Sequence, residues 1–200
     1  MHSVSPNQLT LPYIQTTDHL MPMGQGQLRG SGYLFTQTIA DGLRAGSLWI
    51  VMVDGFGKPA NAHGDIIMLA TITEVDWLSE AEIKLDIAIH QWGALALEPH
   101  HSTTYLQGEI YPIWHDDIQL DNDDILTTRL SQWLAESGSR MQVTATSLTS
   151  ARWVCWRWLE LLPLSLTTKQ RLLKHSSPQV CIRYLKKIIR RSDLITSLLR

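Results

Sequence analysis

The sequence predicts an α+β protein in which a β-rich first part precedes an all-α second part. The clearest sign is the stretch 83–89, where isoleucine or leucine fills every second position, as in a strand with one buried face. Apolar, largely β-branched runs at 48–53 and 65–75 indicate two more strands. From residue 121 onward the apolar spacing becomes that of helices. At 200 residues and 44% hydrophobic content, the chain can bury a sizeable core.

The rest of the first part adds one strand and one helix. Residues 104–114 predict a strand in which Gly108 marks a bulge or a close approach of another group. Residues 33–43 interrupt the strands with helical spacing, so we expect a short helix there. Its spaced apolar residues are Leu34, Ile39 and Leu43.

The second part begins with a helix over residues 125–134. The acidic run 121–124 offers several N-cap residues and complements the helix dipole, and Gly138 is a plausible C-cap. Residues 139–148 are polar and predict turns.

Three more helices follow, which completes the prediction of two domains, residues 8–117 and 121–200. The first runs from Ala151 to Leu162 and ends before a proline. The second is short and ends at Lys174, with Thr167 or Thr168 as its N-cap. The last opens with Ser177 as N-cap and Pro178 in the first helical position.

Positive charge is concentrated in the last quarter of the chain. Residues 151–200 hold eleven Lys and Arg against two acidic residues, a net charge of +9, whereas the first 150 residues carry −11. One interpretation is that the two halves attract each other or simply carry solvated charged faces. The other is that the basic part forms a surface for nucleic acid or for an acidic partner. We favour the former, because the basic residues follow a helical pattern with few aromatic residues on the same face.

The composition excludes several classes of protein. No apolar run reaches the roughly 18 residues that span a bilayer, and the first 13 residues lack the basic and apolar regions of a signal peptide. Cys155 and Cys181 form no metal-type cluster and are expected to be reduced thiols. We therefore expect a cytoplasmic protein with no membrane partner.

A nucleotide site is not indicated. The segment 24–32 is rich in glycine and precedes the helix at 33–43, so its N–H groups could cradle a phosphate. Its spacing matches neither the dinucleotide nor the P-loop pattern, and Gly57-Lys58 is followed by Pro59 rather than Ser or Thr. We predict a flexible connection for 24–32.

Catalytic and metal-binding patterns are weak. Two adjacent histidines on a strand point to opposite faces and therefore seldom bind the same metal ion. The sequence has no Gly-x-Ser-x-Gly motif for a serine nucleophile. Cys155 lies in a tryptophan-rich helix that would bury it and make it unreactive. We expect no cofactor, no metal site and no enzymatic activity. A small metal-dependent hydrolase is the alternative, with nearby aspartates and one of these histidines: His63, His100, His101 or His115.

The C-terminal part resembles the end of the Lon protease N-terminal domain. That family shows a leucine-rich helix, a Leu-Pro-Leu-Ser-like break, a Lys-Gln-x-Leu-Leu turn and a final helix with Arg-Leu. The corresponding segments here are Trp158–Ser165, Lys169–Leu173 and Arg183–Leu185.

The first half agrees with the same family in order. Leu11-Pro12 resembles the family's opening Leu-Pro, and the segment 21–24 resembles its Phe-Pro-Gly. Gly64 followed by 66–75 resembles its Gly-x-x-a-x-I strand, and Gly93 its later glycine. Two local departures occur: only Tyr33 fits the family pattern across 28–33, and the arginine expected after the later glycine is absent from 94–96.

The resemblance implies a PUA-like β pseudobarrel followed by a helical bundle, in a stand-alone form without the ATPase and peptidase domains. It further implies recognition of unfolded or tagged protein segments, or of a protein partner, in protein quality control. Nucleic acid is not expected, because the acidic β-rich half would repel a phosphate backbone; the basic C-terminal helices keep it as an alternative. The candidate peptide-binding residues are Tyr33, Phe35, Phe56, Trp77 and Trp92.

Overall fold

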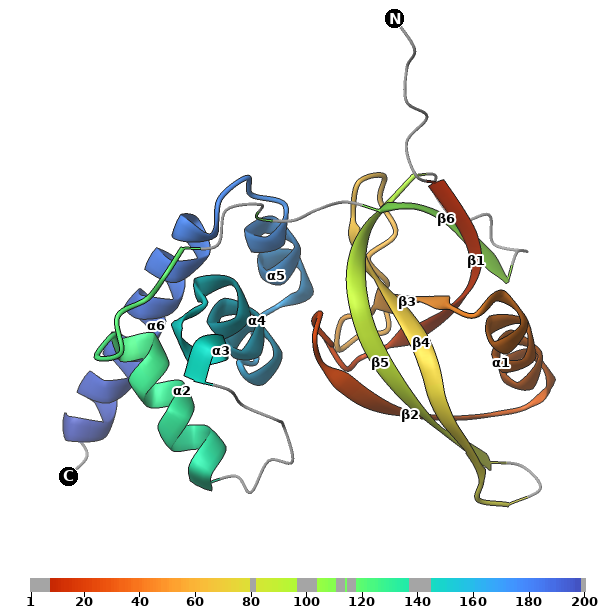
Figure 1. Cartoon of the computed structure of the whole chain (residues 1–200), viewed down its shortest axis with the longest axis horizontal. Coiled ribbons are helices and arrows are strands. Elements are labelled where there is room, and N and C mark those ends of the chain that lie inside the picture. Colours follow the sequence, from red (N-terminus) through yellow and green to blue (C-terminus); the bar gives the residue numbers. More distant parts are fainter. Residues whose placement is uncertain are drawn as a thin grey trace, which may run out of the picture. The chain divides into compact units, whose positions relative to one another are not determined.

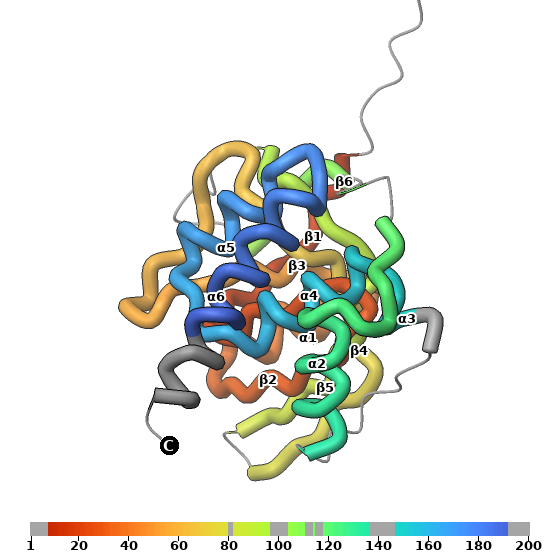
Figure 2. Tube along the Cα trace, turned by 90° about the vertical axis from the view of Figure 1, so that its left-hand side faces the viewer, coloured from red at the N-terminus to blue at the C-terminus, as the bar shows by residue number. Residues whose placement is uncertain are grey.

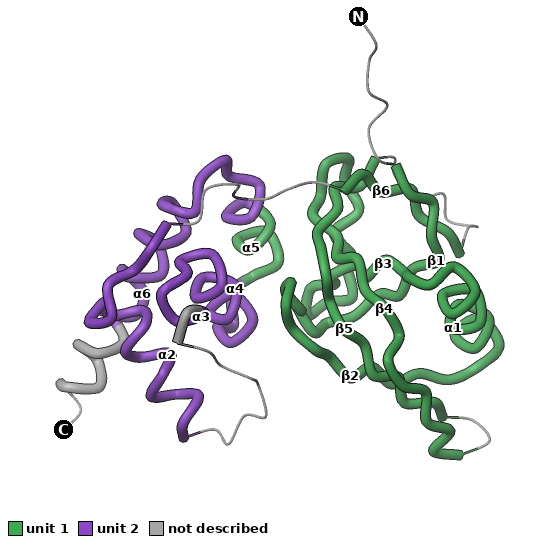
Figure 3. Tube along the Cα trace, viewed as in Figure 1, with its two compact units in different colours: residues 1–113, 165–170 green, residues 114–164, 171–200 purple. Residues whose placement is uncertain are grey.

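The chain forms two compact units, which we describe separately (Figure 3). Unit 1 comprises residues 1–113 and 165–170, and unit 2 comprises 114–164 and 171–200. The computed structural model describes residues 8–79, 82–96, 104–110, 114, 118–136 and 145–198, with only the backbone for 145–146 and 192–198. The predicted domains, 8–117 and 121–200, differ from these units in that residues 165–170 belong to unit 1.

Unit 1 is a six-stranded sheet curved into a barrel, with one helix beside it (Figure 1). Its elements are β1 (Gln8–Thr16), β2 (Gln25–Ser31), α1 (Tyr33–Ala45), β3 (Leu48–Met52), β4 (Ile66–Trp77), β5 (Glu82–Leu95) and β6 (Tyr105–Ile110). The strand order is β2-β5-β4-β3-β1-β6, and β6 pairs again with β5, which closes the ring. Among the described strand pairs, only β1 and β3 run parallel. The predicted α+β fold with a β pseudobarrel is confirmed.

The long strand β5 explains how six strands fit a five-stranded ring. One of its edges pairs with β4 along almost its whole length. The other edge is shared: residues 82–88 pair with β2, and residues 93–95 pair with β6. β2 therefore extends from the ring as an additional strand on the first half of β5.

The interior of the ring is built around the fully buried side chain of Trp49. Its indole lies so close to Gly93 and Gly108 that a Cβ on either would come within 2.6 and 2.7 Å of the ring, respectively. Trp49 Nε1 donates to the carbonyl of Leu9 at 3.3 Å. The predicted close approach at Gly108 is thus confirmed, and the indole is the group that approaches.

Two sequence-based expectations in this unit are wrong in part. The helix at 33–43 is present as α1, but Leu34 and Leu43 are exposed and its buried residues are Thr38, Ile39 and Gly42. A Cβ at Gly42 would stand 3.2 Å from the side chain of Leu48 and 3.3 Å from that of Ile72, so the glycine allows close packing of α1 there.

The segment 24–32 is not a flexible connection, because most of it is strand β2. Gly26 and Gly30 leave room for Leu20 and Phe35, whose side chains lie where a Cβ would be. The strand therefore packs against apolar side chains that belong to other parts of the chain.

Residues 165–170 belong to unit 1 through the buried side chain of Gln170. Its amide oxygen accepts the Ile66 N–H at 2.8 Å, and its amide nitrogen donates to the Ile66 carbonyl at 2.9 Å. The side chain thus pairs with β4 as a neighbouring strand would. Gln170 lies on α5 (Leu166–Leu173), whose N-cap is Ser165 rather than Thr167 or Thr168, since the Ser165 hydroxyl accepts the Thr168 N–H.

Unit 2 is a helical bundle, as predicted. It contains α2 (Ile125–Glu136), α3 (Ala145–Thr149), α4 (Ala151–Leu161), the end of α5 and α6 (Pro178–Leu198). Asp124 caps α2 through the Leu126 N–H, and Ser177 caps α6 through the Gln179 N–H, so both predicted N-caps are confirmed. Helix α3 occupies part of the segment predicted as turns, and Gly138 lies outside the described residues.

Helix α4 forms the core of unit 2 and contacts α2, α3 and α6 (Figure 2). Its three tryptophans are buried: Trp153, Trp156 and Trp158. Trp158 Nε1 donates to the Leu126 carbonyl at 3.1 Å, and the ring of Trp156 stacks on Trp114 with centroids 6.4 Å apart.

No helix in the described ranges is long and apolar enough to cross a membrane.

Candidate functional site

A groove of about 990 Å³ lies in unit 1 where α1 meets β1 and β2, and we call it the α1 groove. One wall is the end of β1 with the residues after it, 13–18. The opposite wall is β2, and α1 contributes Leu34, Phe35 and Thr38. The groove therefore lies where β2 leaves the closed ring of strands.

The backbone of β2 presents unused hydrogen-bonding groups on the edge that faces away from β5. The Ile89 N–H donates to the Gly24 carbonyl, so Gly24 faces β5, and every second residue after it does the same. The N–H and C=O groups of Gln27, Arg29 and Ser31 therefore face the other edge. In the part of the chain that the structure describes, no strand pairs with that edge.

The apolar part of the groove is supplied by α1. The ring of Phe35 lies 2.7 Å from where a Cβ on Gly30 would stand, so the glycine allows the ring to rest on β2. Leu34 lines the groove while being 65% exposed, and Tyr33 precedes it with 78% exposure. An open strand edge and exposed apolar side chains thus lie together.

A side-chain contact ties α1 to the barrel next to this groove. The Tyr105 hydroxyl of β6 donates a hydrogen bond to the Asp41 carboxylate of α1. The pKa of Tyr105 is raised, first by partial desolvation and then by this bond. The contact helps to fix α1 relative to the strands that form the walls.

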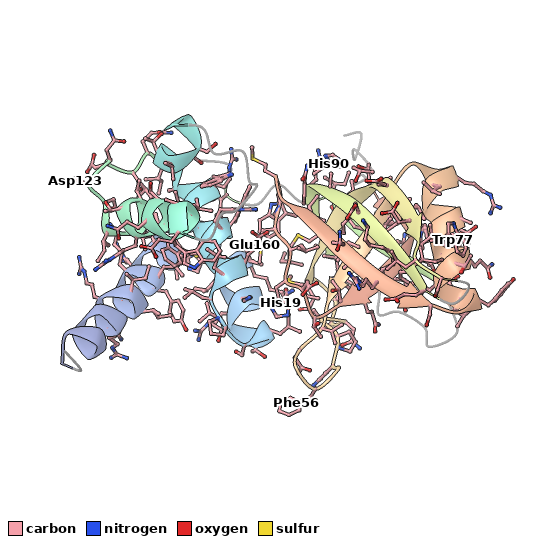
Figure 4. All side chains as sticks on the ribbon, turned by 90° about the horizontal axis from the view of Figure 1, so that it is seen from below. His19, Phe56, Trp77, His90, Asp123 and Glu160 are labelled. Atoms are coloured by element: carbon pink, nitrogen blue, oxygen red, sulfur yellow. The ribbon has the colours of Figure 1, made fainter. Side chains whose placement is uncertain are left out.

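Of the five predicted binding residues, Phe56 and Trp77 lie at different edges of unit 1 (Figure 4), so the five do not form one surface. Phe35 lines the α1 groove, and Tyr33 lies two residues before it at the start of α1. Phe56 is 98% exposed at the tip of the loop after β3, and Trp77 is 64% exposed at the end of β4, at another edge of the unit. Trp92 is 4% exposed and belongs to the core.

Of the four histidines proposed for a hydrolase, the structure describes one, His63. His63 lies on an exposed turn with its Nδ1 2.8 Å from the Ala96 carbonyl oxygen. His100, His101 and His115 lie outside the described residues. Among the residues that the structure describes, no three His, Cys, Asp or Glu side chains are placed to hold a metal ion.

The two cysteines are buried together in the bundle of unit 2. The pKa of Cys155 is raised well above its usual value, mainly by a hydrogen bond with Cys181 and then by burial. Both effects favour the protonated thiol, which is a poor nucleophile.

We expect neither thiol to react with Ellman's reagent in the native protein at pH 8, whereas urea-unfolded protein should release two equivalents. Because the folded state holds the Cys155 proton more tightly than the unfolded state, this contribution to stability is complete below about pH 8.5 and is lost as the pH rises. Urea titrations at pH 8 and pH 10 measure the loss, which should be smaller in Cys155→Ala. Rapid labelling of the native protein would contradict the prediction.

The fold can be compared with known structures. No protein-family model and no curated protein matches the sequence. A crystal structure of a Lon N-terminal domain protein from Xanthomonas campestris is 21% identical and has a TM-score of 0.65, covering 90% of this chain and 98% of that one.

The N-terminal domain of the Lon protease of Mycobacterium avium complex is 13% identical, with a TM-score of 0.63, and covers 91% of this chain and 98% of that one. The chain has the fold of a Lon N-terminal domain. The resemblance read from residues such as 169–173 is thereby confirmed for the fold. Within this Lon N-terminal fold, Gln170 of that motif has a structural role, because its side chain forms two hydrogen bonds with the backbone of Ile66.

Sequence reasoning missed the open edge of β2. Its residues, Gln25–Ser31, include a single large apolar side chain, Leu28, and so give no strand signal by alternation. The sequence feature that could have indicated this edge is the pair Tyr33 and Phe35, which lie on α1 directly after the strand.

Proposed function

We propose that this protein is a non-enzymatic module that binds an extended segment of an unfolded protein in the α1 groove, by adding it as a strand to β2. The observation that carries this proposal is the open edge of β2 facing a groove with exposed apolar side chains. An edge strand offers a row of N–H and C=O groups that an extended peptide can pair with. The Lon N-terminal fold supports the same role, and the buried thiols support a cytoplasmic location.

The proposed mode explains how one groove can bind many sequences. Main-chain hydrogen bonds to Gln27, Arg29 and Ser31 do not depend on the side chains of the bound segment. Phe35 and Leu34 would contact an apolar side chain of the segment, which folded proteins keep buried. The groove therefore selects for unfolded chains through extended conformation and exposed apolar residues together.

The decisive variant is Arg29→Pro. Proline removes the Arg29 N–H from the open edge but takes no hydrogen bond from the β2–β5 ladder, since that N–H faces away from β5. We expect about tenfold weaker binding, because a peptide carbonyl loses its donor. The measurement is fluorescence anisotropy with a labelled protein kept unfolded by reduction and carboxymethylation.

The matched control is Arg29→Ala, which keeps the N–H and removes the same side chain. The ion pair of Arg29 with Glu82 is long, at 3.9 Å, and exposed, so its loss should change stability little. We expect Arg29→Ala to bind within about twofold of the wild type, as a surface change with the backbone donor retained. Equal binding by both variants would refute strand addition, and no binding of the probe by the wild type would refute the function.

A further inference from the structure

Five cationic side chains of unit 2 surround one hollow on the surface of α6, and we call them the α6 basic stripe. They are Arg183, Lys186, Lys187, Arg190 and Arg191. Their spacing of three, four, seven and eight residues from the first places them on one face of the helix. The hollow between them has a volume of about 340 Å³.

Among the side chains that the structure describes, little of this charge is neutralised. Lys186 forms an ion pair with Asp124, the residue that also caps α2. No carboxylate among the described residues pairs with the other four cations. From Arg183 to Arg191 the helix rises about 12 Å, so the four remaining charges are spaced by about 4 Å on average along the helix.

We propose that the α6 basic stripe binds the phosphate backbone of a nucleic acid strand. A single strand carries one negative charge per about 3.4 Å and a duplex one per about 1.7 Å, so the linear charge density of the stripe is close to that of one strand. Half-buried Tyr184 lies three residues before Lys187, which puts an aromatic ring at the border of the stripe, where a base can stack.

The division of the chain also changes the charge argument drawn from the sequence. Unit 2 contains twelve basic and eight acidic residues and is net +4, whereas unit 1 contains five basic and eleven acidic residues and is net −6. The positive charge of unit 2 is less than the +9 of the last fifty residues, but five of its cations are gathered on one helix face. The binding is independent of the α1 groove, which belongs to unit 1.

The test is fluorescence anisotropy of the full chain with labelled single-stranded and duplex DNA of mixed sequence, at several salt concentrations. With four phosphates neutralised, the logarithm of the binding constant should fall with the logarithm of salt with a slope of about −3 to −4. The quadruple variant Arg183→Glu, Lys187→Glu, Arg190→Glu and Arg191→Glu should bind at least about tenfold more weakly. The matched control reverses two exposed cations of unit 1, Arg44 and Lys58, and should retain binding.

A single conservative substitution at the same site should strengthen DNA binding rather than weaken it. Asp124→Asn keeps an N-cap side chain for α2 but removes the charge that pairs with Lys186. We expect tighter DNA binding and a salt slope steeper by about one unit, because a fifth cation becomes available. An unchanged slope in Asp124→Asn overturns the proposal. So does a wild-type protein that binds labelled polyglutamate but not DNA, which would assign the stripe to an acidic protein.

Discussion

Replacement of Gln170 by alanine should lower the free energy of unfolding by about 2–4 kcal/mol. The truncation removes both hydrogen bonds to Ile66 and leaves its N–H and C=O buried without a partner. Each unsatisfied buried group costs about 1–3 kcal/mol, because no water replaces the lost bond. Urea unfolding followed by tryptophan fluorescence measures the change.

Two further glutamine variants separate this explanation from a general effect of side-chain loss. Gln107→Ala removes an amide whose bond is to the exposed side chain of Gln8, so it should cost less than about 0.5 kcal/mol. Gln170→Glu keeps an acceptor for the Ile66 N–H but has no donor for the carbonyl and buries a charge, so it should also be destabilising. If Gln170→Ala were as stable as Gln107→Ala, the pairing with Ile66 would contribute nothing to the fold.

The elements that the sequence predicts well are those whose own side chains carry the pattern. The stretch 83–89 alternates because Ile83, Leu85, Ile87 and Ile89 are themselves buried on one face of the sheet. β2 fails the same test because its positions on that face include Gly26 and Gly30, which are covered by Leu20 and Phe35 from outside the strand. A pattern search cannot detect a strand whose buried surface is supplied by other segments.

A second limit of prediction from the sequence concerns Trp92, one of the candidate binding residues. Counted from Ile89 by strict alternation, Gln91 and Gly93 would share the face of Ile89, and Trp92 would lie on the opposite face. The pairing of β4 with β5 shifts by one residue, since Leu69 faces Gln91 while Ala70 faces Ile89. His90 is thus an extra residue in the ladder, the alternation changes phase, and Trp92 is buried. Such a bulge is set by tertiary pairing and has no local signal in this sequence.

Replacement of Trp49 by alanine should be the most damaging single change in unit 1, with a loss of about 3–5 kcal/mol. The side chain is fully buried and contacts β5 and β6 through two glycines, so its removal leaves a cavity at the point where the ring of strands closes. The same contact makes Gly108→Ala destabilising by about 1–3 kcal/mol, because the new Cβ would stand 2.7 Å from the indole and from Ile67. Thermal and urea unfolding measure both changes.

The control for the glycine is Gly55→Ala, since a Cβ at Gly55 meets no atom within 4 Å. It should be within about 0.5 kcal/mol of the wild type. The double variant Trp49→Ala with Gly108→Ala decides whether the indole is the cause: once the ring is gone, the added methyl group has space and can refill part of the cavity. The double variant should therefore be more stable than the sum of the single effects predicts, by at least about 1 kcal/mol. Strict additivity would show that the strain at Gly108 comes from Ile67 or the backbone rather than from Trp49.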